Sequence, residues 1–268
     1  MEAAHSRPLA VVTGASSGIG FELAKVFAEE GFDLIVAAED EELRTACREL
    51  IQAGAGVESA RVDLSTATGV KELYERIEAT GRPVAALALN AGRGAGGAFA
   101  TETKLEDELE IVDLNCRSTV HLAKLMVADM VARGEGRLLF TSSVAATMPG
   151  AFQAVYNASK SFVQSFALAL RNELKETDVT VTSLMPGPTD TEFFEVAEME
   201  DTKVGAGEKD DPAQVARQGY EALMAGKERV VGGSLENKVQ VAASKVLPDS
   251  KKAEMHRAMA EPGSGEEE

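Results

Sequence analysis

A tyrosine and a lysine four residues apart, Tyr156 and Lys160, form the pair in this sequence with the most direct chemical use. On a helix, both side chains leave the same face about one turn apart. A phenol with a pKa of about 10 exchanges its proton reluctantly near pH 7, and a neighbouring ammonium favours the phenolate. Such a tyrosine can give a proton to a carbonyl oxygen or take one from an alcohol. Taken alone, the pair is more typical of a solvated helix surface.

A serine that follows a short apolar run adds a second polar group. Ser143 lies just beyond residues 137–141 and precedes Tyr156 along the chain. The carboxyl ends of parallel strands present ligand-binding residues at one edge of a sheet. We expect the Ser143 hydroxyl to donate to a substrate oxygen and to stabilise the charge that develops there.

A glycine-rich segment, TGASSGIG at residues 13–20, connects an apolar run to an amphipathic stretch. A turn from a strand into a helix brings backbone N–H groups and a helix N-terminus to one point, which suits a pyrophosphate. Its spacing, G-x-x-x-G-x-G, differs from the general dinucleotide fingerprint G-x-G-x-x-G. The position of the turn at the first crossover of the chain favours a phosphate site over an ordinary connection.

The elements that position these residues alternate between short apolar runs and amphipathic stretches, as in repeated βαβ units with a mostly parallel sheet. The runs are too short for helices and are rich in branched apolar residues, which is typical of strands buried on both faces. The predicted strands span residues 9–13, 34–38, 84–89, 137–141, 179–185 and 229–233, with another short strand ending at Asp63. The predicted helices include one that ends at Gly31, one or two over 104–132, one over 159–176, and one that starts at Asp211-Pro212.

Several motifs, in this order along the chain, resemble those of the single-domain short-chain dehydrogenases/reductases. They are TGASSGIG, Asp63-Leu64, Asn90-Ala91-Gly92, Asn115, Ser143, Tyr156 with Lys160, and Pro186-Gly187 with Thr189 and Thr191. The resemblance covers about residues 9–233. It implies an α/β fold with a Rossmann-like, doubly wound parallel sheet in three α/β/α layers. It also implies an NAD(P)-dependent oxidoreductase that moves a hydride between a nicotinamide and an alcohol, ketone or aldehyde.

The resemblance further implies a role for each motif. The catalytic set is Asn115, Ser143, Tyr156 and Lys160, in which Lys160 also binds the nicotinamide ribose and Asn115 holds a water. The implied cofactor-binding residues are Gly14, Ser16, Ser17, Gly18, Ile19, Gly20, Glu39, Asp40, Asp63, Leu64, Asn90, Ala91, Gly92, Tyr156, Lys160, Pro186, Gly187, Thr189 and Thr191. The predicted substrate residues are Ser143, Phe152, Tyr156, Phe193 and Phe194, which suggest an apolar pocket. A homodimer or homotetramer is implied, with interface helices over 104–132 and 159–176.

Two acidic residues, Glu39 and Asp40, follow the second predicted strand, where the adenosine ribose should lie. A carboxylate there accepts hydrogen bonds from the ribose hydroxyls and repels a 2′-phosphate. Relatives that use NADP commonly carry Arg or Lys there or just before the second glycine of the turn, where this chain has Ser17. NAD is therefore the expected cofactor. NADP is the alternative, and Arg44 is the residue that would reach its phosphate.

The composition of the chain argues against several other classes of protein. A formal charge of −17 without a basic cluster excludes a nucleic-acid partner, and no apolar run is long enough to span a membrane. Two cysteines far apart suggest a reducing compartment, and we predict a cytoplasmic protein. Three scattered histidines and the lack of a G-x-S-x-G motif followed by a suitable histidine argue against a metal centre and a serine hydrolase.

We expect one domain over residues 1–260, with a mobile acidic lid at about 192–211 and a disordered tail at 261–268. The role of 234–268 is open: residues 237–247 could pack against the body or a partner subunit, with a membrane anchor as the alternative. Two other functions stay open. Loss of Tyr156 or Lys160 would favour a non-catalytic dinucleotide sensor, whereas an epimerase or dehydratase would carry a different glycine spacing and a larger C-terminal region.

Overall fold

The computed structural model of the protein describes residues 7–244 and 246–266. Seven parallel strands form one sheet in the order β3-β2-β1-β4-β5-β6-β7. The strands are β1 (Leu9–Thr13), β2 (Asp33–Ala38), β3 (Val57–Arg61), β4 (Val84–Leu89), β5 (Gly136–Thr141), β6 (Val179–Pro186) and β7 (Arg229–Gly232). The strand order reverses between β1 and β4, which is where open sheets of this kind bind ligands.

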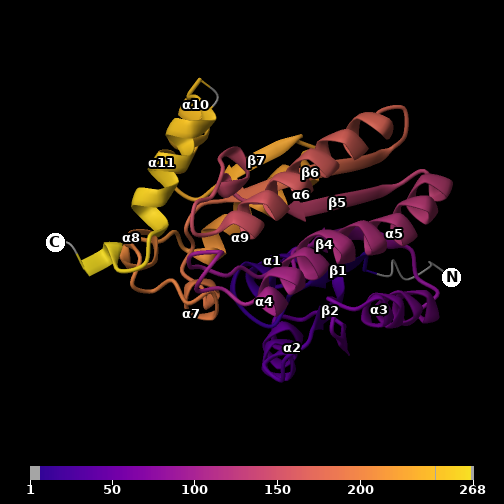
Figure 1. Ribbon diagram of the computed structural model, residues 1–268. Helices are drawn as coiled ribbons and strands as arrows, with labels where there is room; N and C mark the ends of the chain where they lie inside the picture. The colour runs from indigo at the N-terminus through magenta and orange to yellow at the C-terminus, as the bar shows by residue number, and fades with distance from the viewer. Residues whose placement is uncertain (1–6, 245, 267–268) are drawn as a thin grey trace, which may run out of the picture.

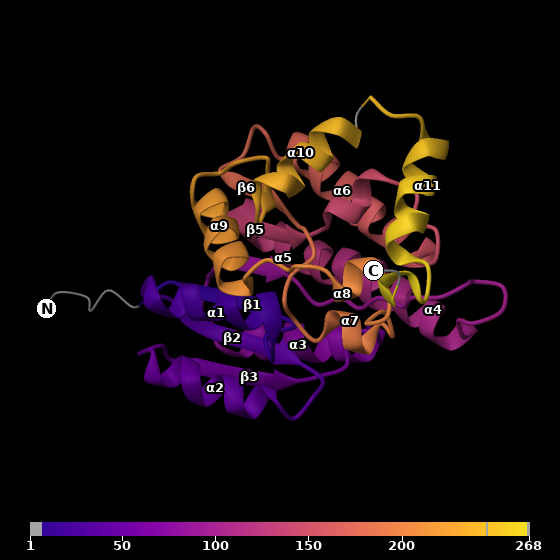
Figure 2. The same cartoon turned by 90° about the vertical axis from the view of Figure 1, so that its left-hand side faces the viewer.

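The helical segments flank the sheet (Figure 1 and Figure 2). The α-helices are α1 (Gly18–Glu29), α2 (Leu43–Gln52), α3 (Ala67–Ala79), α4 (Leu105–Ile111), α5 (Thr119–Arg133), α6 (Ala154–Glu173), α7 (Phe193–Val196), α8 (Lys203–Ala206), α9 (Pro212–Met224), α10 (Leu235–Ser244) and α11 (Asp249–Ala260). Three short segments are η1 (Val112–Ser118, a π-helix), η2 (Val144–Thr147) and η3 (Ser264–Glu266), the last two being 3-10 helices.

Two apolar cores lie on opposite faces of the sheet, which confirms the predicted three-layer α/β/α fold. On one face, α1, α2 and α9 pack against the strands, and the rings of Phe27 and Tyr220 meet edge to face at 5.2 Å. On the other face lie α3, α5 and α6, and Phe140 of β5 meets Phe166 of α6 in the same way at 5.7 Å. The central strand β1 is buried along its whole length, as expected for a strand covered on both faces.

The predicted helical stretch over 104–132 is continuous but irregular. Helices α4 and α5 are joined by the π-helix η1, in which the wider turn accommodates the chain around Asn115. Such π-helical turns often occur at functional sites. Helix α6 begins at Ala154 rather than at 159 and ends at Glu173, so it carries both Tyr156 and Lys160. Asp211 caps the start of α9 by accepting from the Ala213 amide at 2.9 Å, as its sequence predicted.

The prediction of a disordered tail from residue 261 is wrong for the described residues 261–266. The amides of Gly263 and Gly265 donate to the side chain and backbone of Asp201, at 2.8 and 2.9 Å. Ser264 Oγ accepts from the Lys203 amide at 3.0 Å. The acidic, glycine-rich composition suggested solvation, but these backbone groups find partners on the loop before α8. Residues 267–268 lie outside the described residues.

The segment that follows β7 packs partly against the body of the protein. In α10, Val241 is buried against Val144 and Met185, whereas Leu235 and Val239 are 77% and 67% exposed. The side chain of Asn237 donates to Asp210 at 2.6 Å, which ties α10 to the segment before α9. Within the described part of the chain, no helix combines the length and apolar character needed to cross a bilayer.

Candidate active site

A cavity of about 510 Å³ opens at the carboxyl ends of the strands, on both sides of the point where the strand order reverses. Its wall contains every predicted cofactor-binding residue except Asp63, although they come from segments far apart in the sequence. Ser143, Tyr156 and Lys160 line the same cavity, as do Phe193 and Phe194. The sheet therefore brings the predicted phosphate turn and the predicted proton-transfer residues into one space.

The glycine turn before α1 has the shape that a pyrophosphate requires. Gly18 adopts a left-handed backbone conformation with φ of +54°. A Cβ on Gly20 would lie 1.8 Å from the Gly14 carbonyl oxygen, so no side chain fits at this position. The Ser17 side chain does not cap the helix, which leaves the first amides of α1 directed to the cavity. A dinucleotide phosphate fits this cradle because the backbone can approach it closely.

A hydrogen-bond network connects the glycine turn to α6, which carries Tyr156 and Lys160. Thr13 Oγ1 accepts from the amides of Asn90 and Ala91, both at 3.0 Å. The Asn90 side chain donates to the carbonyls of Thr13 and Gly14, and its oxygen accepts from Thr141 Oγ1 at 3.0 Å. The Thr141 carbonyl in turn accepts from Lys160 Nζ at 3.1 Å. The ends of β1, β4 and β5 are thereby fixed relative to α6.

Tyr156 is partly buried in the cavity wall, and Lys160 is buried. Burial raises the pKa of Tyr156 to about 12, with the Ser143 hydroxyl acting in the opposite direction. Burial also lowers the pKa of Lys160 to about 8. The sequence predicted that the ammonium would favour the phenolate. Desolvation outweighs that effect here because Lys160 Nζ lies 5.8 Å from the Tyr156 ring centroid and is directed to the Thr141 carbonyl.

Asn115 lies beside the catalytic pair but not in the cavity wall. Its side-chain oxygen accepts from the Arg93 amide at 3.0 Å, and its nitrogen donates to the Arg93 carbonyl and to Ser159 Oγ, both at 2.9 Å. The side chain is 1% exposed. Asn115 therefore joins the π-helix to the loop after β4 and to α6, and a Cβ on Gly92 would lie within 3.1 Å of both Asn115 Oδ1 and Lys160 Nζ. Its predicted contact with a water stays a prediction.

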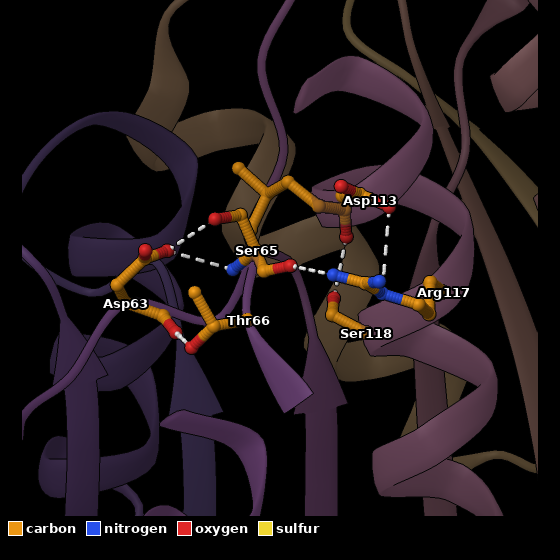
Figure 3. Close-up of polar contacts among 7 residues, drawn as sticks. Asp63, Ser65, Thr66, Asp113, Arg117 and Ser118 are labelled. Atoms are coloured by element: carbon orange, nitrogen blue, oxygen red, sulfur yellow. Dashed lines mark hydrogen bonds and ion pairs between the residues drawn. The ribbon is translucent and has the colours of Figure 1, made fainter. Parts of the chain in front are cut away.

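Asp63 is not among the residues of the cavity wall, and it organises the turn that follows β3 (Figure 3). Its carboxylate accepts from the amide and hydroxyl of Ser65 at 2.8 and 2.6 Å, and its carbonyl accepts from Thr66 Oγ1 at 2.9 Å. Arg117, paired with Asp113 at 3.4 Å, donates to the Ser65 carbonyl. The neighbouring Leu64 does line the cavity, so the backbone here reaches the predicted adenine site while the Asp63 side chain does not.

The end of β2 presents two carboxylates with different surroundings. Asp40 accepts from Ser16 Oγ at 2.7 Å and from the Leu43 amide at 3.2 Å, so it joins the glycine turn to α2. Glu39 lines the cavity, and its pKa is raised by partial burial and by the nearby carboxylates. Arg93 counteracts this shift, but its guanidinium is paired with Asp107 at 3.5 Å and with Glu110.

Apolar side chains enclose the end of the cavity nearest Tyr156, whose ring lies 5.1 Å from that of Phe193. Phe152 was predicted to contact substrate, but it is not a wall residue. It packs against the buried cluster of Phe194, Ala197, Met199 and Ala260, with the Arg257 guanidinium 4.8 Å from its ring. Sequence reasoning missed other residues of this wall, notably Gln153, Val204, His256, Met259 and Ala260. No apolar periodicity marked residues 249–260 as part of a site, because only their contacts with distant segments place them there.

Comparison with known proteins gives consistent results. The sequence profile of the short chain dehydrogenase family matches residues 8–201. The NADP-dependent 3-hydroxy acid dehydrogenase of Salmonella typhi is 31% identical over 189 residues, which cover 70% of this chain and 75% of that protein. A short-chain dehydrogenase/reductase from Burkholderia phymatum in complex with NAD is similar with a TM-score of 0.80 at 25% identity, covering 96% and 98% of the two chains. A short-chain dehydrogenase from Sphingobium yanoikuyae in complex with NADPH gives 0.77 at 26% identity, covering 84% and 87%.

The chain thus belongs to the short-chain dehydrogenase/reductase family, as its motifs predicted. It is an NAD(P)-dependent oxidoreductase that acts on alcohol or carbonyl substrates. The similar structures contain either NAD or NADPH, so they do not by themselves select one cofactor.

Proposed function

We propose that Tyr156 is the proton donor and acceptor of this oxidoreductase, and that its substrates are uncharged carbonyl compounds or alcohols with an apolar body. The observation that carries the proposal is the joint presence of Ser143, Tyr156 and Lys160 in the wall of a cavity whose other end is the glycine turn. Both residues whose loss would indicate a non-catalytic sensor are present. Apolar side chains such as Phe194 and Met259 shape the substrate end.

The nicotinamide, when bound, supplies or accepts the hydride at the substrate carbon. In reduction, Ser143 Oγ donates a hydrogen bond to the substrate oxygen and orients it. Tyr156 transfers its phenolic proton to that oxygen, and in oxidation it removes the proton. Lys160, still charged near pH 7, would offset part of the desolvation that raises the pKa of Tyr156, and its ammonium would also hold the nicotinamide ribose. Pro186, Gly187, Thr189 and Thr191 line the same cavity and would hold the carboxamide.

Substitution of the phenol tests the assignment of the proton donor. Tyr156→Phe is expected to lower turnover by at least about a hundredfold while NADH or NADPH binding survives, because only the hydroxyl is removed. Nicotinamide absorbance would follow reduction of a panel of ketones and aldehydes, and fluorescence titration would follow binding. Tyr74→Phe is a matched control, since that hydroxyl lies on α3 and contacts only Asp129 among the described side chains. Turnover of Tyr156→Phe at the level of the control would refute the assignment.

We further propose that NAD is preferred over NADP. The Glu39 carboxylate borders the cavity among other acidic groups, and Arg93, which is close enough to affect it, is already paired with two carboxylates. A 2′-phosphate would meet net negative potential there. The measurement is kcat/KM for both cofactors with one substrate, and a preference for NADPH of about tenfold or more would contradict the proposal.

Charge reversal at the end of β2 extends this test. Glu39→Arg with Asp40→Ser should shift the preference towards NADP by about 1–3 kcal/mol, the scale for replacing a repulsive charge contact with an attractive one. Because Asp40 also holds Ser16, the single variant Asp40→Asn serves as a control for damage to the glycine turn. An unchanged preference in the double variant would show that these carboxylates do not contact the ribose.

We propose a cytoplasmic homo-oligomer. The two cysteines, Cys47 and Cys116, are unpaired, as suits a reducing compartment. Leu105 and Leu109 of α4 and Phe162 of α6 are 64%, 54% and 44% exposed, so both predicted interface helices carry uncovered apolar side chains. Sedimentation of the purified protein should give a dimer or tetramer, and a monomer at micromolar concentration would contradict this assembly.

A further inference from the structure

The wall of the substrate end contains a histidine for which the oxidoreductase mechanism has no use. His256 lies on α11, beside α8 (Figure 1 and Figure 2), and is 6% exposed. It lines the cavity together with Met259 and Ala260 of the same helix. The helix therefore supplies one polar group, the imidazole, and two apolar side chains to the wall.

Contacts with the catalytic loop fix the position of this helix. His256 Nδ1 lies 2.9 Å from the Ala151 carbonyl, and Lys252 Nζ donates to the Thr147 carbonyl at 3.5 Å. Both carbonyls belong to the stretch between Ser143 and Tyr156. The imidazole is thus held against the loop that connects the two residues expected to contact the substrate oxygen.

The hydrogen bond to Ala151 also determines what the imidazole can offer to a ligand. A carbonyl oxygen only accepts, so Nδ1 carries the proton. Burial lowers the pKa of His256, which keeps the ring neutral near pH 7 and leaves Nε2 as an acceptor. Nε2 has no hydrogen-bond partner among the described residues, and this atom is not fully buried. Because His256 lines the cavity, Nε2 is the ring atom left to accept a hydrogen bond from a ligand bound there.

We propose that His256 is a specificity-determining residue, which accepts a hydrogen bond from a hydroxyl or amide N–H of the substrate remote from the reacting carbon. The inference rests on the proposed function and narrows its substrate class to uncharged, apolar carbonyl compounds with a second, hydrogen-bond-donating group. Gln153 also lines the wall, and its amide oxygen can accept a hydrogen bond as well, so the His256→Leu variant is needed to separate its contribution from that of His256. The Glu192 carboxylate, also in the wall, disfavours a negatively charged second group.

A matched series of ketones tests this inference. The probes are ω-hydroxyalkyl phenyl ketones with about three to seven methylene groups, each paired with the ketone that has methyl in place of the hydroxyl. Reduction would be followed with NADH and NADPH. At the chain length that spans the cavity, the wild type should prefer the hydroxy compound by at least about tenfold in kcat/KM, because an unpaired polar group in the site penalises the analogue.

Three variants distinguish a contact with the substrate from support of the fold. His256→Leu should abolish the preference, whereas His256→Gln should retain most of it, because the amide oxygen can take the place of Nε2. Lys252→Met removes the other tether of α11 without altering the cavity wall, and it should leave the preference unchanged. Thermal unfolding of each variant would verify folding.

The outcomes separate this inference from the function on which it rests. Turnover of the ketones with no preference at any chain length, or an equal preference in His256→Leu, overturns the role of His256 alone. Loss of the preference in Lys252→Met to the same extent as in His256→Leu would show that α11 acts only as a support. A complete lack of turnover of both series, with Tyr156→Phe indistinguishable from wild type, would count against the oxidoreductase assignment itself.

Discussion

Replacing Lys160 with methionine is expected to stabilise the folded protein while removing most of its turnover. The ammonium is 6% exposed, and burial lowers its pKa from 10.5 to about 8. At about 1.4 kcal/mol per pKa unit, the folded state disfavours this charge by about 3 kcal/mol. Methionine keeps an unbranched apolar side chain but leaves the Thr141 carbonyl without its side-chain donor, which costs about 1 kcal/mol. The net gain in the free energy of unfolding should be about 2 kcal/mol.

The pH dependence of stability gives an independent measure of the free-energy cost of burying the Lys160 ammonium. Because the folded pKa of Lys160 lies below the unfolded value, the unfolded chain binds more protons above about pH 8. This group therefore makes the wild type more stable as pH rises from about 8 towards 10, and Lys160→Met should lack that increase. Tyr156, whose folded pKa is raised, acts with the opposite sign above about pH 10, but it is present in both proteins and cancels in the difference.

Urea denaturation at pH 7 and pH 9.5 would measure the difference in stability, and fluorescence titration with NADH or NADPH would measure cofactor affinity. Both turnover and cofactor affinity should fall, because the proposed roles of Lys160 are to place a positive charge near the Tyr156 phenol and to bind the nicotinamide ribose. Lys71→Met, at a side chain 71% exposed, is the control and should change the free energy of unfolding by less than about 0.5 kcal/mol. A Lys160→Met protein less stable than wild type at pH 7 would refute the reasoning, since it would mean that the buried ammonium is stabilising.

Three further predictions concern the turn, the lid and the histidine. Gly20→Ala should weaken cofactor binding by at least about tenfold, because its Cβ would lie 1.8 Å from the Gly14 carbonyl oxygen. Gly31→Ala strains the backbone at φ of +87° but places its Cβ in open space away from the turn, so it should retain affinity in the same fluorescence titration. Residues 192–211 should gain protection from hydrogen exchange when NADH and a ketone bind, and unchanged protection would exclude a lid. His256, whose pKa is lowered in the folded state, should contribute a loss of stability as pH falls below about 6.5; acid denaturation of His256→Gln with the same pH dependence as wild type would disprove this contribution.

The sheet could be predicted because its strands are short apolar runs whose residues are buried on both faces, as in β1 and β4. The edge strand β3 was harder, since only Ala60 of its five residues is buried and the segment has little apolar pattern. The π-helix around Asn115 could not be predicted either, because the extra residue in its turn is set by contacts with Arg93 and Ser159 rather than by local propensity.

The cofactor half of the site was accessible to sequence reasoning because its residues occur in local motifs at strand ends. The substrate half was accessible only in part: Phe193 and Phe194 line the cavity as predicted, whereas other wall residues were missed. Phe152 lies close to the motifs in the sequence, but its side chain is not part of the cavity wall. Its backbone adopts a φ of +64°, and its ring packs against the Arg257 guanidinium. His256 lies far from the motifs and reaches the cavity through tertiary contacts that leave no periodic signal.

The position of α11 in the wall affects the order in which the site can form during synthesis. Residues 249–266 follow all seven strands, so the glycine turn and the catalytic helix emerge from the ribosome before the histidine-bearing wall exists. Domains tend to fold as their N-terminal parts emerge. A nascent chain with a complete sheet can therefore hold a dinucleotide before it can enclose a substrate. Binding at that stage would stabilise the native sheet by mass action while the remaining residues are still being added.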